Sequence, residues 1–568
     1  MKNTTGKRSF LQSALVLTIS TFFVKIAGLL FTIAVQRALL DSGMGVFYSA
    51  YNIYNLFAVL ASAGLPVAVS RMISETLVNE NHDEAQKIYK VSARLFLAIG
   101  AVVAGAMLIF GDALAKMIGN PDAGLSIRVL AVTAFCAFIM SALRGYFQGH
   151  NYMKPTAVSQ VIEAFVKLGL GLAMAILIMK AGGTDKLGSA GAIIGVSVGA
   201  VIAVVYLLFK KRGYDKGTPL VGMETRSTSA IVKELFRIAV PVSLGASVMS
   251  VVNVIDDYLI MNILQDGAGL FGAKIGGLGY LYDYAKSLNG IFGNAKKIFN
   301  LPSAFIVPFT VSILPVLTAA YVAKNRDEIN KNLSNCFKYS MMIALPSGVG
   351  MIILAKPIYN LLYKTADADL GAAMLAIFGI AVILYALVSI SGSILQAFGK
   401  VNRPLISLVV GGVVKCVLTA VLVSIPEINI KGAPIATCVC YVVMIVMNMI
   451  FLRKFIKDSV KQILLSLLKT ALAAAIMGGA TYGVFILLSS VLDIYSSRTM
   501  AVISMIIMLA VAVAVYFASV FLLKVITPGE LKETLGLRGR RRSLKKGADE
   551  ETGEGYTDIS GEDNEKKQ

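Results

Sequence analysis

The chain has 568 residues, of which 57% are hydrophobic and only 15% are charged, and its mean hydropathy is +0.75. This composition excludes an ordinary soluble globular protein, and the apolar runs of about 20 to 28 residues are long enough to cross a bilayer. The formal net charge of +20 does not indicate nucleic-acid binding, because most Lys and Arg residues lie in the loops between apolar runs. The sequence therefore predicts an all-α polytopic membrane protein.

In the first half of the chain the apolar runs predict six spans joined by short connections. They lie at about 11–39, 46–71, 92–117, 127–147, 156–179 and 190–209. The second half repeats this number and adds a final pair. These spans lie at about 236–263, 299–322, 336–361, 371–396, 404–425, 432–453, 465–489 and 499–524. We therefore expect about 14 transmembrane helices.

The spans divide the chain into five regions. They are an N-terminal lobe at 1–209, a cytoplasmic linker loop at 210–233, a C-terminal lobe at 234–453, two extra helices at 454–525 and a charged tail at 526–568. The tail has no apolar periodicity, so we expect it to be disordered. The loops on one side, together with both ends, hold about 30 Lys and Arg residues against about a dozen on the other side. This asymmetry predicts that both termini are cytoplasmic.

Between the first two spans of the second half lies a segment rich in Gly and Tyr, at 265–300, which contains Lys286, Lys296 and Lys297. We expect this segment on the external side. The sequence leaves open whether it forms a re-entrant or an interfacial helix.

Two short motifs recur at nearly the same offset and suggest that the halves are related. Leu-Pro-Val at 65–67 returns at 314–316, and a Gln and a Lys 19 residues apart, at 148 and 167, return at 396 and 415. Repeated halves around a central site are a common plan of secondary transporters. Coincidence is the alternative explanation for two matches this short.

The sequence contains no catalytic constellation. It has no P-loop, no loop long enough to fold as a soluble catalytic domain, and no metal-ligand spacing among its two His and five Cys residues. We therefore predict that the protein is not an enzyme and has no metal site and no cofactor.

The functional candidates are ionisable residues within the spans, where a charge is costly unless it faces a partner or a water-filled cavity. The deepest are Lys25, Glu163, Lys167, Asp256, Asp257 and Lys415, and those nearer the span ends are Arg37, Arg71 and Arg144. Lys25 and Lys415 have no carboxylate one helical turn away, which favours a basic cavity for an anionic substrate. Pairing with an aspartate on another helix is the alternative.

The remaining charges have simpler explanations of comparable weight. Glu163 and Lys167 are four residues apart and can form an ion pair within their helix. Arg71 and Arg144 can extend to the cytoplasmic headgroups.

Two further patterns point to a moving transporter. Gly64, Pro66 and Pro315 lie in or at the starts of spans and are candidate hinges, with kinks that serve packing as the alternative. A polar stripe on the second span suits a hydrated lumen, although a helix–helix interface would also accept it. Its residues are Tyr51, Asn52, Tyr54 and Asn55.

The stretches GLPVAVSR at 64–71 and RGYFQG at 144–149, followed by Pro155, resemble the polysaccharide-export flippases of Gram-positive bacteria. These are the stage V sporulation protein B type and its lipid II flippase relatives, within the multidrug/oligosaccharidyl-lipid/polysaccharide exporter superfamily. The resemblance covers about residues 10–525 and leaves the tail outside.

The resemblance implies two six-helix lobes around a central cavity, two extra C-terminal helices that form a groove for a lipid tail, and alternating access. It implies an undecaprenyl-pyrophosphate-linked sugar as substrate, met by cavity cations. By position, Lys25, Arg37, Arg71 and Arg144 would supply positive charge in the first lobe, and we add Lys167 and Lys415 as substrate-binding candidates. Coupling to Na⁺ or H⁺ through Glu163, Asp256 or Asp257, or to the membrane potential, remains open.

We therefore predict a multi-pass flippase of the bacterial cytoplasmic membrane that carries lipid-linked cell-envelope oligosaccharide. Lipid II is the expected cargo, and cell-wall synthesis proteins are candidate partners. A Na⁺- or H⁺-coupled multidrug exporter of the same fold is the first alternative, but it would need acidic residues to dominate the cavity. A membrane-embedded glycosyltransferase or ligase is the second, but it would need a large external loop with catalytic side chains. A non-transporting scaffold is the third.

Overall fold

The computed structural model describes residues 2–215, 222, 224–266, 278–365, 367–456, 459–491 and 497–526, and within these ranges the side chains at 2–19, 266, 278–280, 307–315 and 454 lie outside the described part. Nearly all of these residues are helical and none of them forms a strand, which confirms the all-α prediction. The predicted disorder of the tail at 526–568 concerns residues that, after the first, lie outside the described ranges.

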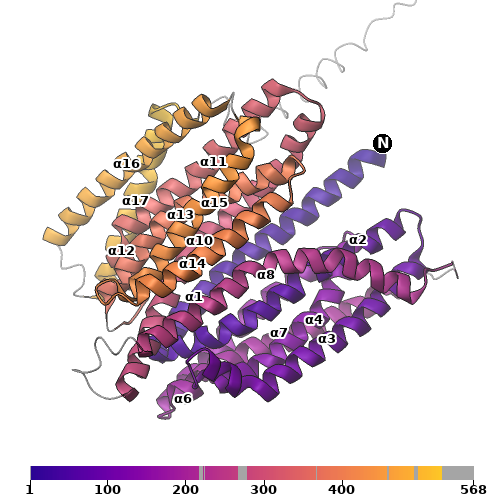
Figure 1. Ribbon diagram of the computed structural model, residues 1–568, viewed down its shortest axis with the longest axis horizontal. Coiled ribbons are helices and arrows are strands. Elements are labelled where there is room, and N and C mark those ends of the chain that lie inside the picture. The colour runs from indigo at the N-terminus through magenta and orange to yellow at the C-terminus, as the bar shows by residue number, and fades with distance from the viewer. Residues whose placement is uncertain are drawn as a thin grey trace, which may run out of the picture.

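The first half of the chain forms one group of helices, drawn in indigo to magenta in Figure 1. Its elements are α1 (Lys2–Ala63), α2 (Leu65–Leu77), α3 (His82–Met117), α4 (Ala123–Gly149), α5 (Lys154–Val166), a π-helical turn (Lys167–Gly171), α6 (Leu172–Lys180) and α7 (Asp185–Asp215). At Leu40 the backbone of α1 is not helical, with φ 58° and ψ −167°. This kink divides α1 into two segments, as the two predicted spans require.

The second half forms the other group. Its elements are α8 (Thr228–Asp266), α10 (Leu278–Val322), α11 (Arg326–Ile353), α12 (Ala355–Leu362), α13 (Ala368–Ala397), α14 (Asn402–Val423), a 3₁₀ turn (Asn429–Lys431), α15 (Gly432–Ile456), α16 (Val460–Val491) and α17 (Arg498–Leu522). The last two helices pair with each other on the outside of this group, against α11 and α12 (Figure 1). They match the predicted extra pair.

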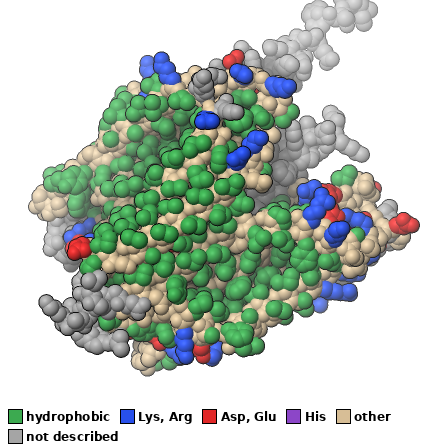
Figure 2. Space-filling model, in the orientation of Figure 1, with side chains coloured by type: hydrophobic (Ala, Val, Ile, Leu, Met, Phe, Trp, Pro, Cys, Tyr) green, Lys and Arg blue, Asp and Glu red, His purple; other side chains and the backbone are tan. Residues whose placement is uncertain are grey.

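Twelve segments of the described chain are long and apolar enough to cross a membrane. The first, Ser20–Leu77, has 58 residues and includes the kink at Leu40, so it is long enough for two crossings. The 45-residue helix α10 is a further long helix. In Figure 2 hydrophobic side chains cover the middle of the face and charged side chains gather near the helix ends, as a bilayer-spanning protein requires.

Helix α10 differs from the expectation for residues 265–300. From Leu278 onward this segment is a helix continuous with the following span, so the interpretation of this part as an external segment separate from that span is wrong. The reason is that Gly and Lys residues lower the local hydropathy although the backbone remains helical. As a consequence, Lys296 and Lys297 belong to the bundle.

The two motif stretches that carried the family resemblance lie against each other, on α2 and α4. A Cβ at Gly145 would lie 2.8 Å from the Cβ of Val69, and one at Gly149 would lie 2.8 Å from the Cβ of Ile73. The Ser74 hydroxyl donates to the Gly149 carbonyl at 2.9 Å. These glycines therefore allow the two helices to approach closely, which explains why the motifs occur together.

Both halves begin one long helix in the same way. Asn81 accepts a hydrogen bond from the Glu84 amide before α3, and Asn325 accepts one from the Glu328 amide before α11. An Asn N-cap with acidic residues in the first turn stabilises a helix start.

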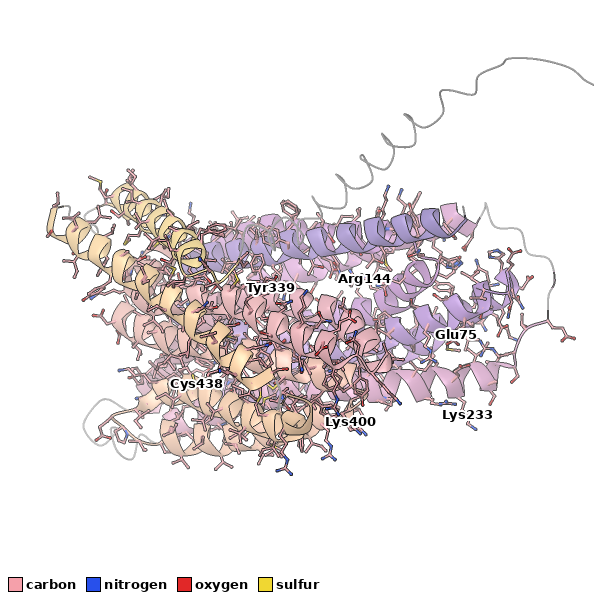
Figure 3. The ribbon with its side chains drawn as sticks, turned by 90° about the horizontal axis from the view of Figure 1, so that it is seen from above. Glu75, Arg144, Lys233, Tyr339, Lys400 and Cys438 are labelled. Atoms are coloured by element: carbon pink, nitrogen blue, oxygen red, sulfur yellow. The ribbon has the colours of Figure 1, made fainter. Side chains whose placement is uncertain are left out.

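Glu75 and Lys233, on segments predicted to be cytoplasmic, lie toward the same end of the molecule in Figure 3.

Candidate functional site

A cavity of about 610 Å³ lies between the two groups of helices, lined mainly by α1, α5, α8 and α10. Helix α1 packs against both α4 and α10, and α8 packs against both α1 and α14, so these two helices separate the groups. The charged residues that line the cavity are Lys25, Glu163, Lys167, Asp256, Asp257, Lys296 and Lys297. Five of these seven are among the residues predicted from the sequence.

The polar stripe on the second half of α1 faces this cavity. Tyr51, Asn52, Tyr54 and Asn55 all line it, which confirms the prediction of a polar lumen rather than a lipid-facing surface. Neighbours on α10 and α8 add the amides of Asn289, Asn300 and Asn253.

Aromatic rings hold two of the cavity lysines. The Lys167 ammonium lies 4.6 Å from the ring centroid of Phe31 and 4.9 Å from that of Tyr51. The Lys297 ammonium lies 5.6 Å from the ring centroid of the same Tyr51. Such contacts stabilise a cation electrostatically without neutralising it, so the charge remains available to a ligand.

Lys296 is held by an amide instead, because its ammonium donates to the Asn253 side-chain oxygen at 2.9 Å. Among the described residues, no carboxylate oxygen lies within 4 Å of the ammonium groups of Lys25, Lys167, Lys296 or Lys297. Four cavity lysines are therefore not ion-paired within the part of the chain that the structure describes.

Lys167 begins the π-helical turn in the middle of the α5–α6 span. Gly171 in this turn lies against Gly195 of α7, where an added Cβ would meet the Gly171 amide nitrogen at 2.2 Å. The turn therefore needs glycine on both helices, and single π turns often occur at functional sites.

The alternative ion pair between Glu163 and Lys167 is not formed. Glu163 instead accepts from the Arg144 guanidinium at 2.5 Å, and Arg144 also donates to the Ser159 hydroxyl at 3.1 Å. Helix α4 thus supplies the partner of this cavity carboxylate, and Arg144 stands behind the cavity wall rather than on it.

A second cavity carboxylate is neutralised in the same manner. Lys415 of α14 is only 2% exposed and forms an ion pair with Asp256. Thr419 donates to the same carboxylate at 3.0 Å. Interhelical pairing, which the sequence left as the alternative for Lys415, is therefore the observed arrangement. Asp257 accepts from Asn289 at 2.7 Å and has no cationic partner among the described residues.

The two remaining predicted cations lie away from the cavity. Arg71 is exposed and pairs with Glu75 at 2.7 Å, one helical turn along α2. Arg37 lies in a separate pocket at the opposite end of the bundle. The lysines that the sequence reasoning left out are Lys296 and Lys297, and a test for helical continuity through 278–322 is the signal that would have found them.

The predicted hinge at Gly64 coincides with the break between α1 and α2. Ser243 of α8 donates to the Leu60 carbonyl at 2.9 Å, and Ser141 of α4 donates to the Ala61 carbonyl at 2.7 Å. Hydroxyls of two neighbouring helices thus bond to carbonyls in the last turn of α1, directly before the break. Pro315 lies within α10, in the stretch whose side chains are outside the described part.

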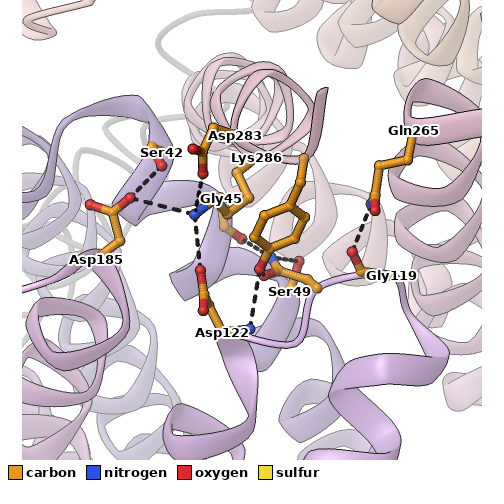
Figure 4. Close-up of polar contacts among 11 residues, drawn as sticks. Ser42, Gly45, Ser49, Gly119, Asp122, Asp185, Gln265, Asp283 and Lys286 are labelled. Atoms are coloured by element: carbon orange, nitrogen blue, oxygen red, sulfur yellow. Dashed lines mark hydrogen bonds and ion pairs between the residues drawn. The ribbon is translucent and has the colours of Figure 1, made fainter. Parts of the chain in front are cut away.

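The end of the cavity near the Leu40 kink is closed by a polar cluster (Figure 4). Lys286 of α10, 5% exposed, pairs with Asp122 at 2.9 Å and Asp283 at 2.8 Å, and lies 3.7 Å from Asp185. Ser42 of α1 also bonds to Asp185. One ammonium thus joins α10 to α4 and α7 of the first half. We call these four charged residues the outer seal.

Backbone contacts next to the outer seal are equally close. A Cβ at Gly45 would lie 2.0 Å from the Lys286 carbonyl, and one at Gly290 would lie 1.9 Å from the Asp41 carbonyl. Only glycine fits at these crossings of α1 and α10. The charge asymmetry of the loops predicts that this end is external, so the cavity faces the predicted cytoplasmic side.

Two helical groups around a charged cavity that is closed at one end define a multi-pass membrane transporter. The chain belongs to the polysaccharide biosynthesis protein family, whose model matches residues 10–321. The family model of the lipid II flippase MurJ matches residues 285–501. The resemblance stated from the motifs is thereby confirmed, and the match is to flippase-type transporters rather than to enzymes.

Individual proteins agree with this assignment. The lipid II flippase MurJ of Bacillus subtilis (strain 168) is 26% identical over 550 residues, which cover 93% of this chain and 97% of the relative. Stage V sporulation protein B of the same organism is 22% identical, over 80% of this chain and 86% of its own length.

Two solved structures share the fold. An inward-facing transporter of the multidrug resistance MATE family in the MOP superfamily superimposes with a TM-score of 0.62 and 18% identity, covering 79% of this chain and 99% of its own. The lipid II flippase MurJ in an inward closed conformation superimposes with a TM-score of 0.62 and 14% identity. This match covers 89% of this chain and 98% of the flippase chain.

Proposed function

We propose that the protein flips an undecaprenyl-pyrophosphate-linked cell-envelope oligosaccharide, with lipid II as the cargo, from the inner to the outer leaflet by alternating access. The single observation that carries this proposal is the set of four cavity lysines for which the described chain supplies no ion-pair partner. Two of the three lining carboxylates are neutralised by cations behind the wall, so the free charge of the cavity is positive. A pyrophosphate headgroup, which cannot enter hydrocarbon unaided, matches that sign.

The extent of the similarity to lipid II flippase MurJ of Bacillus subtilis supports the same cargo. We place the protein in the bacterial cytoplasmic membrane with both termini in the cytoplasm, where lipid-linked precursors would enter the cavity through its open end. Each elementary charge moved through the membrane potential is worth about 2.3 kcal/mol per 100 mV. An inside-negative potential therefore favours outward movement of the anionic headgroup and return of the empty basic cavity.

Among the cavity carboxylates, Asp257 alone has no cationic partner in the described chain. If transport is coupled to Na⁺ or H⁺, Asp257 is therefore the residue we assign to that role. The multidrug exporter of the same fold is the second candidate, favoured only by the shared MATE-type fold. The uncompensated lysines argue against it, since they would repel cationic drugs.

The test is translocation of fluorescent lipid II in proteoliposomes that contain the full-length protein. We expect Lys167→Gln together with Lys297→Gln to reduce the initial rate at least about tenfold, because each charged contact to a phosphate is worth about 1.5–3 kcal/mol. Lys186→Gln, which removes one exposed charge from the start of α7, is the matched control and should transport normally.

Each other outcome has a defined meaning. If wild type moves a different polyprenyl-linked glycan but not lipid II, the cargo assignment is wrong. If it moves no lipid-linked glycan and expels cationic dyes, the exporter candidate replaces this proposal. If the lysine variants transport at the wild-type rate, the cavity lysines do not carry the headgroup.

A further inference from the structure

A second charged pocket lies at the predicted external end of the bundle, apart from the central cavity. It has a volume of about 630 Å³ and is formed where α1, α12 and α17 meet. Among the described residues that line it, three are cations, namely Arg37, Lys364 and Arg498, and none is acidic. External segments of membrane proteins are usually poor in Lys and Arg, so three cations in one external pocket need an explanation.

The three cations are not neutralised within the described chain. No carboxylate oxygen of a described residue lies within 4 Å of the charged groups of Arg37, Lys364 or Arg498. The two described acidic residues that follow Lys364 most closely in the sequence are engaged elsewhere. Asp367 caps the Leu370 amide at 2.8 Å, and Asp369 pairs with Lys356 at 2.8 Å.

The pocket presents further groups that favour an anion. Arg37 uses its Nε and Nη2 atoms to donate to the Leu361 and Leu362 carbonyls, the shortest at 2.8 Å, which fixes the guanidinium at the base of the pocket. Arg498 is the first residue of α17, a 25-residue helix whose N-terminus carries a partial positive charge. Ser497 caps this helix by accepting from the Met500 amide.

The surface beside the pocket is apolar and exposed. Along α17 the residues Val502, Ile503 and Ile506 are 39%, 45% and 61% exposed. A ligand whose phosphate reached the three cations would therefore lay its hydrocarbon part against α17. This combination distinguishes a lipid from a free phosphate ion, which would gain nothing from the apolar face.

We propose that this pocket binds the phosphate headgroup of an outer-leaflet phospholipid, with an acyl chain along α17. Arg37 comes from the first half of the chain, whereas Lys364 and Arg498 come from the second. The Gln36 amide joins the same seam by donating to the Lys364 carbonyl at 2.5 Å. The site is therefore complete only while the outer end is closed, so a bound lipid stabilises that state. The proposal does not rest on the cargo of the central cavity.

The test uses the full-length protein in phosphatidylcholine nanodiscs, titrated with fluorescent phosphatidic acid and with diacylglycerol of the same chains. We expect phosphatidic acid to bind and diacylglycerol to bind at least about tenfold more weakly. Arg498→Gln should weaken phosphatidic acid binding about tenfold, and the triple variant Arg37→Gln/Lys364→Gln/Arg498→Gln should abolish it. The charge-matched control Lys186→Gln should bind like wild type.

Arg498 is exposed in the first turn of its helix, so the single variant should fold normally, which an unchanged melting temperature checks. The proposal is overturned if the triple variant binds phosphatidic acid like wild type, or if Lys186→Gln weakens binding equally. It is also overturned if millimolar inorganic phosphate displaces the lipid completely, because the pocket would then be a site for free phosphate. Failure of lipid II transport in the wild type would leave this binding result unaffected.

Discussion

Replacing Lys286 with Met should open the outer end of the molecule. The side chain of Lys286 is 5% exposed, and its ammonium faces three carboxylates, at 2.8, 2.9 and 3.7 Å. Removing one partner of a buried ion pair costs about 3–5 kcal/mol. The side chains of Asp122 and Asp185 are 32% and 28% exposed, and that of Asp283 is 68% exposed. Water therefore solvates these carboxylates in part and lowers the cost of removing the cation.

We therefore expect the closed state to lose about 2–3 kcal/mol relative to the open one. This corresponds to a shift of roughly 30- to 150-fold in the equilibrium between the two states. The three aspartates, left without the cation, also repel one another across the seam between α10 and the first half. Both effects act in the same direction.

The measurement is a pulsed electron paramagnetic resonance distance between spin labels at Lys186→Cys, at the start of α7, and Glu427→Cys, in the turn after α14. Both positions lie on the predicted external side, and the five native cysteines are replaced. Lys286→Met should add or enlarge a long-distance population. Lys356→Met is the control, because Lys356 pairs with the exposed Asp369 on the same side. An unchanged distance distribution in a folded Lys286→Met protein would refute the role of the outer seal.

Three further predictions concern the packing and the cavity wall. Gly145→Leu should lower the melting temperature, because it overpacks α4 against Val69 and Pro66 at a cost of about 1–3 kcal/mol. Gly105→Ala should leave the melting temperature unchanged, because a Cβ added there meets nothing within 4 Å. Lys415→Met should lower the free energy of unfolding in denaturant by about 3–5 kcal/mol, because it leaves Asp256 buried and unpaired. The double variant Lys415→Met/Asp256→Leu should recover most of this loss. A double variant as unstable as the single one would contradict this account. Arg144→Gln should slow lipid II translocation, because Glu163 then adds an uncompensated negative charge to the cavity. The double variant Arg144→Gln/Glu163→Gln should restore the translocation rate. If the double variant is as slow as the single one, Arg144 acts in another way.

The sequence predicted the properties that depend on composition and on local pattern. Apolar runs gave the helical class and the order of the spans, and the stripe from Tyr51 to Asn55 was correctly expected to face a polar lumen. The close contact of the two motifs could have been anticipated from their glycines. These features follow from residues adjacent along one helix face, which the sequence displays directly.

The partners of the intramembrane charges could not be predicted from the sequence. Lys415 and Asp256 are separated by many helices in the chain, and only the packing of α8 against α14 brings them together. Glu163 had a suitable partner one turn away in Lys167, but the aromatic rings of α1 hold that ammonium and Arg144 of α4 takes its place. Tertiary geometry decides such pairings.

Hydropathy also misdirected the assignment of the cavity cations. Lys296 and Lys297 lie in a stretch whose charges and glycines resemble an external loop, although the helix that carries them begins at Leu278. Arg37 and Arg71 were expected at the cavity because the family resemblance, applied by position, implied it. In the structure Arg37 lies in a separate pocket and Arg71 pairs with Glu75 on the surface.

The ammonium of Lys415 is part of the polypeptide, so its local concentration beside Asp256 stays the same whatever salt surrounds the cell. A dissolved ion at the same carboxylate would be diluted away in a salt-poor medium and would compete with other ions in a salt-rich one. The tethered cation makes this part of the second half insensitive to the ionic composition of the growth medium. While this pair is formed, the Asp256 carboxylate is occupied by a cation that the protein itself supplies.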